Sequence, residues 1–149
     1  MLKSDVHSTS VAMNGLLGRL IGVSQTLSSM LSGFAARYQL TENECFGLLT
    51  LKDNDAITGK MLGTLCGMHK TKVSRLMRSL EHRGLIVCKR DATDLRKVSI
   101  NLTPRGAALA SEVARAADEL NLQLERTASK DRDNLYQALG ALIAGMKAV

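Results

Sequence analysis

Apolar side chains in the N-terminal part of the chain recur at the spacing of an α-helix. Between residues 11 and 38 they are separated alternately by three and four positions, at Met13, Leu16, Leu20, Val23, Leu27, Met30 and Phe34. This period gathers them on one helical face, so the pattern predicts a long amphipathic helix. The same segment contains Gly15, Gly18, Gly22 and Gly33. Glycine weakens an isolated helix, and we therefore expect this one to be held by packing against another element.

The next segment, "TENE", has the form of a helix N-terminus. In a capping box the side chains of Thr41 and Glu44 each accept a hydrogen bond from the other residue's backbone N–H. Leu40 and Cys45, on either side of this cap, are apolar and can pack together. The pattern predicts a short helix over residues 42–51.

A second short helix is predicted over residues 59–66, after the polar turn "KDNDA". Thr58 precedes it and can cap its first turn. Leu62 and Leu65 are expected on the inner side of this helix, because they lie three positions apart.

Residues 70–83 combine helical periodicity with positive charge. Their apolar positions fall on one face, at Val73, Leu76, Met77 and Leu80. Lysine and arginine occupy other positions, and Gly84 stands where a helix commonly ends in the left-handed conformation. The pattern predicts an amphipathic helix with a cationic outer face.

The period of the pattern then changes from that of a helix to that of a strand. Residues 98–102 alternate apolar and polar side chains, and "LIVCK" at residues 85–89 supplies an apolar partner. The charged segment "RDATDLR" lies between them. We predict two strands joined by this loop as a hairpin.

Two more helices are predicted in the C-terminal part of the chain. Thr103 can cap the first, and Pro104 suits its first position. Its apolar stripe continues to about residue 127. Ser129 can cap a last helix, in which Asp131 and Asp133 would lie near the positive end of the helix dipole.

This order of elements predicts a fold that is mainly α with a small β-hairpin, in the α+β class. A helix pair joined by a short turn and followed by a two-stranded hairpin is a winged helix-turn-helix. We assign residues 1–149 to a single domain and residues 41–102 to the winged helix-turn-helix.

The positive charge of the chain is concentrated in one segment. The formal net charge of the 149 residues is +6. Residues 69–97 carry nine Lys or Arg and three Asp or Glu, and the other 120 residues carry eleven of each. A neutral body with one cationic segment indicates that this segment faces an anion. An α-helix fits the major groove of duplex DNA, so the helix and hairpin of this segment are predicted to contact DNA.

Several other classes of protein are disfavoured. Aromatic residues make up 3 % of the chain, without Trp, which argues against single-strand binding by base stacking. Metal-ligand spacing, a catalytic triad and a phosphate loop are lacking, so we expect no metal, no cofactor and no enzymatic activity. The N-terminus lacks the apolar core of a signal peptide, and no apolar run approaches the ~18 residues of a membrane span. We expect a cytoplasmic protein without a membrane partner.

The three cysteines Cys45, Cys66 and Cys88 lie far apart, which argues against a disulfide framework. Cys88 lies beside Lys89 and Arg90, whose charges could lower the pKa of its thiol. A thiol-based redox-sensing regulator acting through Cys88 is therefore one alternative function. A second is a non-specific architectural protein that coats DNA through charge alone.

The segments "LCGMHKTKVSRLMRSLEHRGLI" and "DATDLRKVSINLTPRG" resemble the recognition helix and wing of the MarR family of bacterial transcription regulators. The resemblance implies a homodimer in which residues 1–40 and 103–149 form the dimerisation helices. It also implies binding to a pseudo-palindromic operator in double-stranded DNA. Family members are usually repressors, and a small organic effector often releases them.

The predicted DNA-binding residues combine this resemblance with the charge pattern. On the helix they are Lys70, Thr71, Lys72, Ser74, Arg75 and Arg78, and on the hairpin Lys89, Arg90, Asp94, Arg96 and Lys97. By the resemblance, Arg96 corresponds to a wing arginine that enters the minor groove and Asp94 to an acid that steadies the wing. Cys88 and Leu95 stand where the family often has basic residues, so we expect this wing to make fewer phosphate contacts.

Overall fold

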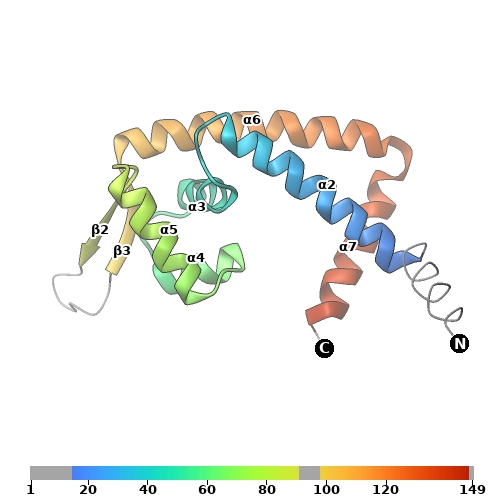
Figure 1. The fold of residues 1–149 in the computed structure, drawn as a ribbon, viewed down its shortest axis with the longest axis horizontal. Coiled ribbons are helices and arrows are strands. Elements are labelled where there is room, and N and C mark those ends of the chain that lie inside the picture. The colour runs from blue at the N-terminus through green and yellow to red at the C-terminus, as the bar shows by residue number, and fades with distance from the viewer. Residues whose placement is uncertain (1–14, 91–97, 148–149) are drawn as a thin grey trace, which may run out of the picture.

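The computed structural model describes residues 15–90 and 98–147 and shows a mainly helical chain with a small antiparallel sheet (Figure 1). The predicted fold class is confirmed. In chain order the elements are α2 (Leu16–Ala36), α3 (Glu42–Asp53), β1 (Ile57–Thr58), α4 (Gly59–Cys66), α5 (Lys70–His82), β2 (Ile86–Arg90), β3 (Val98–Leu102), α6 (Pro104–Ala128), a 3-10 turn (Ser129–Asp131) and α7 (Arg132–Lys147). Among these described elements, none has the length and apolar character needed to cross a bilayer.

The sheet has one strand more than the sequence predicted. β2 and β3 pair antiparallel as the expected hairpin, with Ile86 opposite Leu102, while their connecting segment lies outside the described residues. β1 adds to the other edge of β3, with Ile57 opposite Ile100, so the strand order is β1-β3-β2. A strand of two residues is too short to show the alternation that reveals strands in a sequence.

The core lies where the short helices, the sheet and the first half of α6 meet. Its largest fully buried side chains come from α3, α4, α5, the turn after α5, β3 and α6, and are Leu48, Leu62, Leu80, Leu85, Ile100 and Val113. Gly106 brings α6 against the backbone of the turn after α5, since an added Cβ would lie 1.9 Å from the Leu85 carbonyl oxygen. The α5 helix is thus held in place by a closely packed core.

The helix caps predicted at Thr41, Thr58 and Thr103 are formed. The Thr41 hydroxyl accepts from the Glu44 N–H at 3.2 Å, and the Glu44 carboxylate accepts from the Thr41 N–H at 2.8 Å. The Thr58 and Thr103 hydroxyls cap α4 and α6. Gly84 adopts the left-handed conformation after α5, with φ +66°. These local signals explain why the helix starts were predictable.

Two predictions about helix faces and ends are wrong. Leu65 is 49 % exposed, because α4 approaches α5 through Gly59 and Gly63 and turns Leu65 away. Ser129 does not cap the last helix: its φ is +33°, it follows α6 directly, and α7 begins only at Arg132. Asp131 therefore lies in the connecting turn, and Asp133 lies in the first turn of α7.

The two terminal helices leave large apolar surfaces uncovered. α2 runs from the core toward α7, and in Figure 1 these helices lie well apart from the sheet. The exposed apolar side chains of these two helices are Leu16, Leu17, Ile21, Val23, Leu27, Met30, Leu135, Leu139, Ile143 and Met146. Such surface exceeds what a single chain normally leaves in water and indicates an interface.

Candidate nucleic-acid interface

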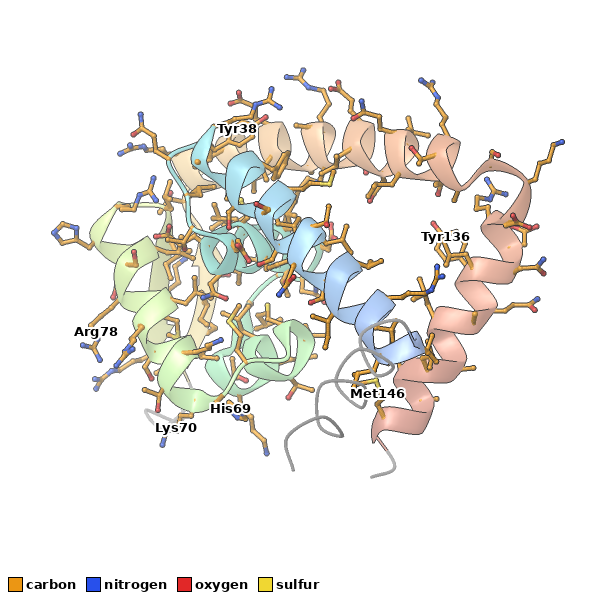
Figure 2. The ribbon with its side chains drawn as sticks, turned by 45° about the vertical axis from the view of Figure 1, so that its right-hand side comes forward. Tyr38, His69, Lys70, Arg78, Tyr136 and Met146 are labelled. Atoms are coloured by element: carbon orange, nitrogen blue, oxygen red, sulfur yellow. The ribbon has the colours of Figure 1, made fainter. Side chains whose placement is uncertain are left out.

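The α5 helix divides into a buried apolar face and an exposed polar face. Val73, Leu76 and Leu80 are buried against the core. All six residues that the sequence analysis selected on this helix are exposed: Lys70, Thr71, Lys72, Ser74, Arg75 and Arg78. We call these six residues the α5 outer face. Figure 2 shows Lys70 and Arg78 pointing away from the rest of the molecule.

The start of α5 is an electropositive helix end. His69 occupies the N-cap position with extended backbone, and within the described residues its side chain makes no capping hydrogen bond. Gly67, in the left-handed conformation with φ +63°, closes the tight turn between α4 and α5. The unpaired N–H groups of the first turn and the partial positive charge of the helix dipole favour an anion there.

The cations of the α5 outer face form no ion pair within residues 15–90 and 98–147. In those ranges the ion pairs lie elsewhere, and they join Lys52 to Asp53, Arg83 to Glu44, and Arg132 to both Glu125 and Asp133. An unneutralised cationic face on a helix is the feature that duplex DNA attracts.

The hairpin brings two more of the predicted residues to the same side of the molecule. Lys89 and Arg90 are exposed at the end of β2, and the hairpin lies next to α5 in Figure 1. The predicted residues Asp94, Arg96 and Lys97 lie outside the described residues. The structure therefore groups the helix residues with the first two hairpin residues.

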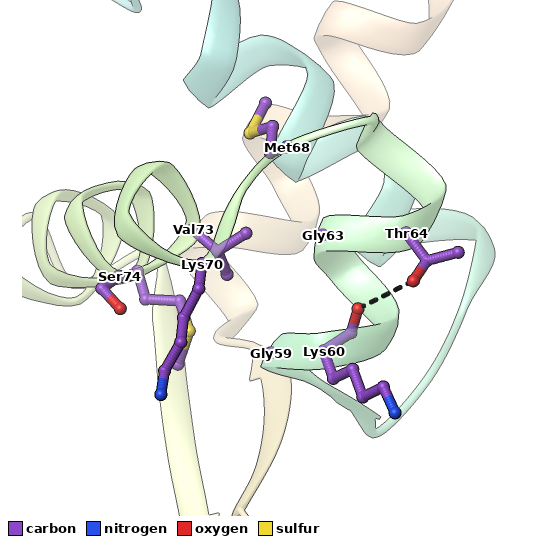
Figure 3. A pocket seen from close by; sticks show the side chains of 9 residues that line it. Gly59, Lys60, Gly63, Thr64, Met68, Lys70, Val73 and Ser74 are labelled. Carbon is purple, nitrogen blue, oxygen red and sulfur yellow. Dashed lines mark hydrogen bonds between the residues drawn. The ribbon is translucent and has the colours of Figure 1, made fainter. Parts of the chain in front are cut away.

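A groove between α4 and α5 adds a cation that the sequence analysis missed. It has a volume of about 580 Å³, and its walls include Lys60, Lys70 and Ser74. Figure 3 shows Lys60 on α4 and Lys70 on α5, one on each of the two helices that line this groove. The Thr58 cap is the sequence signal that could have identified Lys60, because it places Lys60 in the first turn of α4. α4 is the first helix of the helix-turn-helix, and in such motifs the first helix crosses the DNA backbone.

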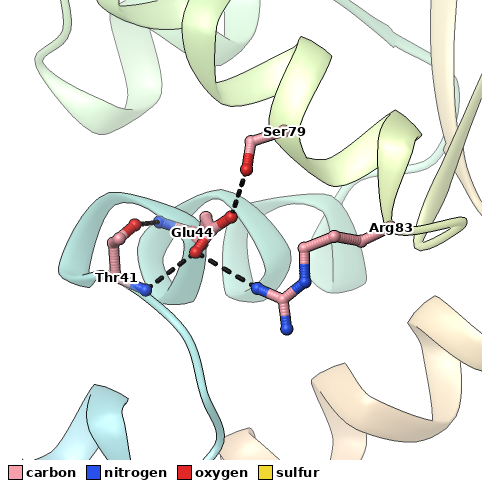
Figure 4. A network of polar contacts seen from close by, with 4 residues as sticks. All are labelled: Thr41, Glu44, Ser79 and Arg83. Atoms are coloured by element: carbon pink, nitrogen blue, oxygen red, sulfur yellow. Dashed lines mark hydrogen bonds and ion pairs between the residues drawn. The ribbon is translucent and has the colours of Figure 1, made fainter.

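Glu44 connects α3 to the C-terminal half of α5 (Figure 4). Its carboxylate accepts from the Ser79 hydroxyl at 2.6 Å and from the Arg83 guanidinium at 3.3 Å, besides the Thr41 N–H. Burial acts to raise the pKa of Glu44, but the hydrogen bonds from Ser79 and Thr41 and the charge of Arg83 outweigh it, so this pKa lies below its usual value of 4.5. Arg83, at the C-cap of α5, is not among the residues predicted to bind DNA.

The expectation of a lowered pKa at Cys88 is wrong. Partial burial raises the pKa of this thiol, and the charge and hydrogen bond of Glu81 raise it further. A thiol that resists ionisation is a poor nucleophile toward oxidants. Cys45 is buried in the core, and burial together with the charge of Glu44 raises the pKa of its thiol to about 11.

A smaller hollow of about 260 Å³ lies between α2 and α6. Met30, Phe34 and Leu120 give it apolar walls, and Arg37 and Glu119 add one charge of each sign. Within the described residues, no cluster of three or more His, Cys, Asp or Glu side chains could hold a metal ion.

Comparisons with known proteins agree with this geometry. The family model described as "Transcriptional regulator SarA/Rot" matches residues 29–113. The organic hydroperoxide resistance transcriptional regulator of Bacillus subtilis (strain 168) is 25% identical over 130 residues, which cover 87% of this chain and 88% of that protein.

Two solved structures illustrate the similarity of fold. The transcriptional repressor CouR, bound to a 23-mer DNA duplex, has a TM-score of 0.75 and 24% identity over 89% of this chain and 95% of its own. The MarR family transcription regulator SP03579 has a TM-score of 0.76 and 20% identity over 96% of this chain and 94% of its own. At these identities the similarity establishes a common fold.

Proposed function

This chain belongs to the MarR family of winged helix-turn-helix transcription regulators, and on that premise we propose that it is a homodimeric, operator-specific repressor. It is a transcription regulator and not an enzyme. The proposal adds a specific operator in double-stranded DNA, release by a small organic effector, and a cytoplasmic location.

One observation carries the proposal: six polar or cationic side chains share the exposed face of a helix whose other face is buried in the core. A helix about 10–12 Å across fits the ~12 Å major groove. Side chains at the start of this helix, Lys70, Thr71, Lys72, Ser74 and Arg75, are assigned to base edges and nearby phosphates. Arg78 is assigned to the adjoining phosphates.

The hairpin is assigned to the neighbouring DNA backbone. Lys89 and Arg90 lie at its exposed end. Asp94, Arg96 and Lys97 stay predictions from the sequence. Lys60, at the start of α4, joins these residues as a phosphate contact, because it shares the groove with Lys70.

A homodimer is supported by the uncovered apolar faces of α2 and α7. A two-fold partner would bury them and set two α5 helices on one side of the assembly. Dimeric helix-turn-helix proteins space their half-sites about one helical turn apart. A pseudo-palindromic operator follows from that symmetry.

The hollow between α2 and α6 is the proposed effector site. Its volume, about 260 Å³, suits a small ligand, and its apolar walls with Arg37 suit an organic anion with an apolar body. An effector bound there would favour one arrangement of the helices that carry the two α5 copies. If that arrangement spaces them wrongly for the grooves, DNA is released.

The test is a footprint on the DNA upstream of the chain's own gene, with random duplex as competitor. We expect protection of a palindrome that random DNA displaces only at ~10³-fold or greater excess. Equal competition by random duplex would favour the non-specific architectural alternative instead. Addition of benzoate-like anions to the parent and to Arg37→Ala then tests the effector site, since release should require Arg37.

A further inference from the structure

We propose that Glu44 is a positioning residue for DNA recognition, which fixes the rotation of α5 about its own axis and so aims the α5 outer face at the groove. This inference rests on the proposed function, because it concerns how operator-specific contacts are held. Glu44 itself lies behind α5 and not among the residues assigned to DNA.

The bonds of Glu44 exceed what a helix cap requires. A capping box needs only the exchange between Thr41 and Glu44. Here the Glu44 residue is 5 % exposed, and it is the one buried charged residue in residues 15–90 and 98–147. One oxygen accepts from Ser79, and the other accepts from both Thr41 and Arg83.

The two partners, Ser79 on α5 and Arg83 at its C-cap, are placed to fix the orientation of this helix. Ser79 and Arg83 are four residues apart, so they lie on one face about one helical turn apart. Both reach the same carboxylate, at 2.6 and 3.3 Å. Two directional bonds one turn apart resist both rotation and sliding of the helix.

Apolar packing alone leaves this orientation less well defined. α3 and α5 approach closely at Gly47, where an added Cβ would lie 2.8 Å from Leu76 Cδ2. Contacts of this kind set the distance between two helices, but they are non-directional and tolerate small rotations. The hydrogen bonds to Glu44 supply the direction, because their strength falls steeply with angle.

A small rotation would matter at the DNA. Arg75 precedes Ser79 by four residues and Arg78 precedes it by one, so the helix carries them rigidly with Ser79. For a guanidinium about 8 Å from the helix axis, a rotation of about 10° moves the donor by more than about 1 Å. That displacement is enough to break a bidentate bond to a base, whereas a phosphate contact adapts to it.

The experiment compares specific with random DNA at one salt concentration. Duplexes of about 25 bp, spanning two half-sites, are selected by the parent protein from a random pool. The measured quantity is the ratio of affinities for the selected and random duplexes. In Glu44→Gln we expect this ratio to fall roughly tenfold, because base contacts are lost. Affinity for random DNA should stay the same or rise, since a negative charge is removed.

Two control variants separate positioning from charge and from stability. Glu81→Gln removes the same charge from an exposed site on α5 and should keep the ratio of the parent. Val113→Ala leaves a cavity in the core under α6 and should lower the melting temperature without changing the ratio. At the other end of the bond, Arg83→Met should reproduce the loss, and Arg83→Lys should restore most of it.

The outcomes are distinct. An unchanged ratio in Glu44→Gln, with a specific parent, would overturn this inference and leave the proposed function standing. A ratio that falls equally in Val113→Ala would overturn it too, because stability alone would then explain the loss. A parent that binds both duplexes equally would overturn the proposed function and this inference with it.

Discussion

Glu44 shows at the residue scale how one buried carboxylate serves two helices. Its hydrogen bonds join residues 35 and 39 positions apart in the chain. A capping box can be read from four consecutive residues, and the pattern of Thr41 and Glu44 predicted it correctly. The bonds to Ser79 and Arg83 could not be predicted, because helical periodicity says nothing about which helix lies opposite.

The pH dependence of stability tests these bonds. The pKa of Glu44 is lower in the folded chain than its usual value of 4.5, so its bonds stabilise the fold fully above that pH. The contribution is lost as the pH falls through the lower, folded pKa. We expect the free energy of unfolding of the parent to exceed that of Glu44→Gln at neutral pH, and the difference to shrink as the pH falls below 4.5.

Urea unfolding of both proteins across this pH range is the measurement. Glu112→Gln, which removes a carboxylate from an exposed site on α6, is the charge-matched control. A difference between parent and Glu44→Gln that stays constant with pH would contradict the prediction.

Arg75 is the residue on the α5 outer face whose role is easiest to test. If it reads a base, Arg75→Ala should weaken operator binding by about 1–3 kcal/mol and leave random DNA nearly unaffected. Fluorescence anisotropy with both duplexes measures this. Arg115→Ala, an exposed arginine on α6, is the matched control and should bind as the parent does. A uniform loss on all sequences would make Arg75 a phosphate contact only.

Cys88 is expected to react slowly with alkylating reagents. Partial burial and Glu81 raise the pKa of its thiol, so less thiolate is present at about pH 7.5 than in an unfolded chain. Glu81→Gln should lower this pKa and speed the reaction, and mass spectrometry of the labelled peptide measures the rate. The same rate in both proteins would show that Glu81 does not act on Cys88. The sequence placed two cations beside this thiol, but could not show the carboxylate from α5.

At the scale of elements, the sequence predicted best those features that depend on residues close together in the chain. The starts of α3, α4 and α6 follow from Thr41, Thr58 and Thr103, each of which bonds only three residues ahead. The inner face of α4 was harder to predict, because a helix of eight residues has only about two turns and shows little periodicity. β1 is shorter still, and its pairing depends on β3, about 40 residues later along the chain.

Gly106 makes the contact between α6 and the turn after α5 possible. An added Cβ would lie 1.9 Å from the Leu85 carbonyl oxygen, and that oxygen also accepts from the Thr103 N–H at 3.1 Å. Gly106→Ala must therefore separate α6 from this turn, and we expect a loss of at least about 1–3 kcal/mol in the free energy of unfolding. Denaturant unfolding measures it.

Gly67→Ala is the control for this prediction. Gly67 also lies at the end of an element, with φ +63°, but an added Cβ there meets nothing within 4 Å. Gly67→Ala should lower the free energy of unfolding by the backbone strain alone, about 1–2 kcal/mol. If Gly106→Ala unfolds no more easily than Gly67→Ala, the contact at Leu85 is less tight than the structure indicates.

At the scale of the whole molecule, the apolar faces of α2 and α7 predict a partner copy of the chain. Ile143, on α7, is 56% exposed in the single chain. Burying a carboxylate in an apolar interface is costly, so Ile143→Asp should convert the dimer to a monomer and abolish operator binding. Light scattering after gel filtration gives the mass. Val87→Asp, at a 38% exposed apolar position on β2, should leave the dimer intact.

The sequence indicated this arrangement in outline. The apolar stripe from Leu16 to Phe34 is longer than the core can cover, and the glycines within it weaken the helix in isolation. The stripe predicted a helix that needs packing, and the structure leaves most of that stripe exposed. The sequence of one chain could not show which surface covers this stripe, because the covering surface belongs to the second chain of the dimer.

The uncovered faces of α2 and α7 also shape how a promoter would sense the abundance of this protein. When chains are scarce, the concentration of pairs grows with the square of the concentration of single chains. A twofold change in gene dosage then alters promoter occupancy about fourfold. Control by this regulator would therefore switch on sharply at a threshold of expression and fade quickly as dividing cells dilute it.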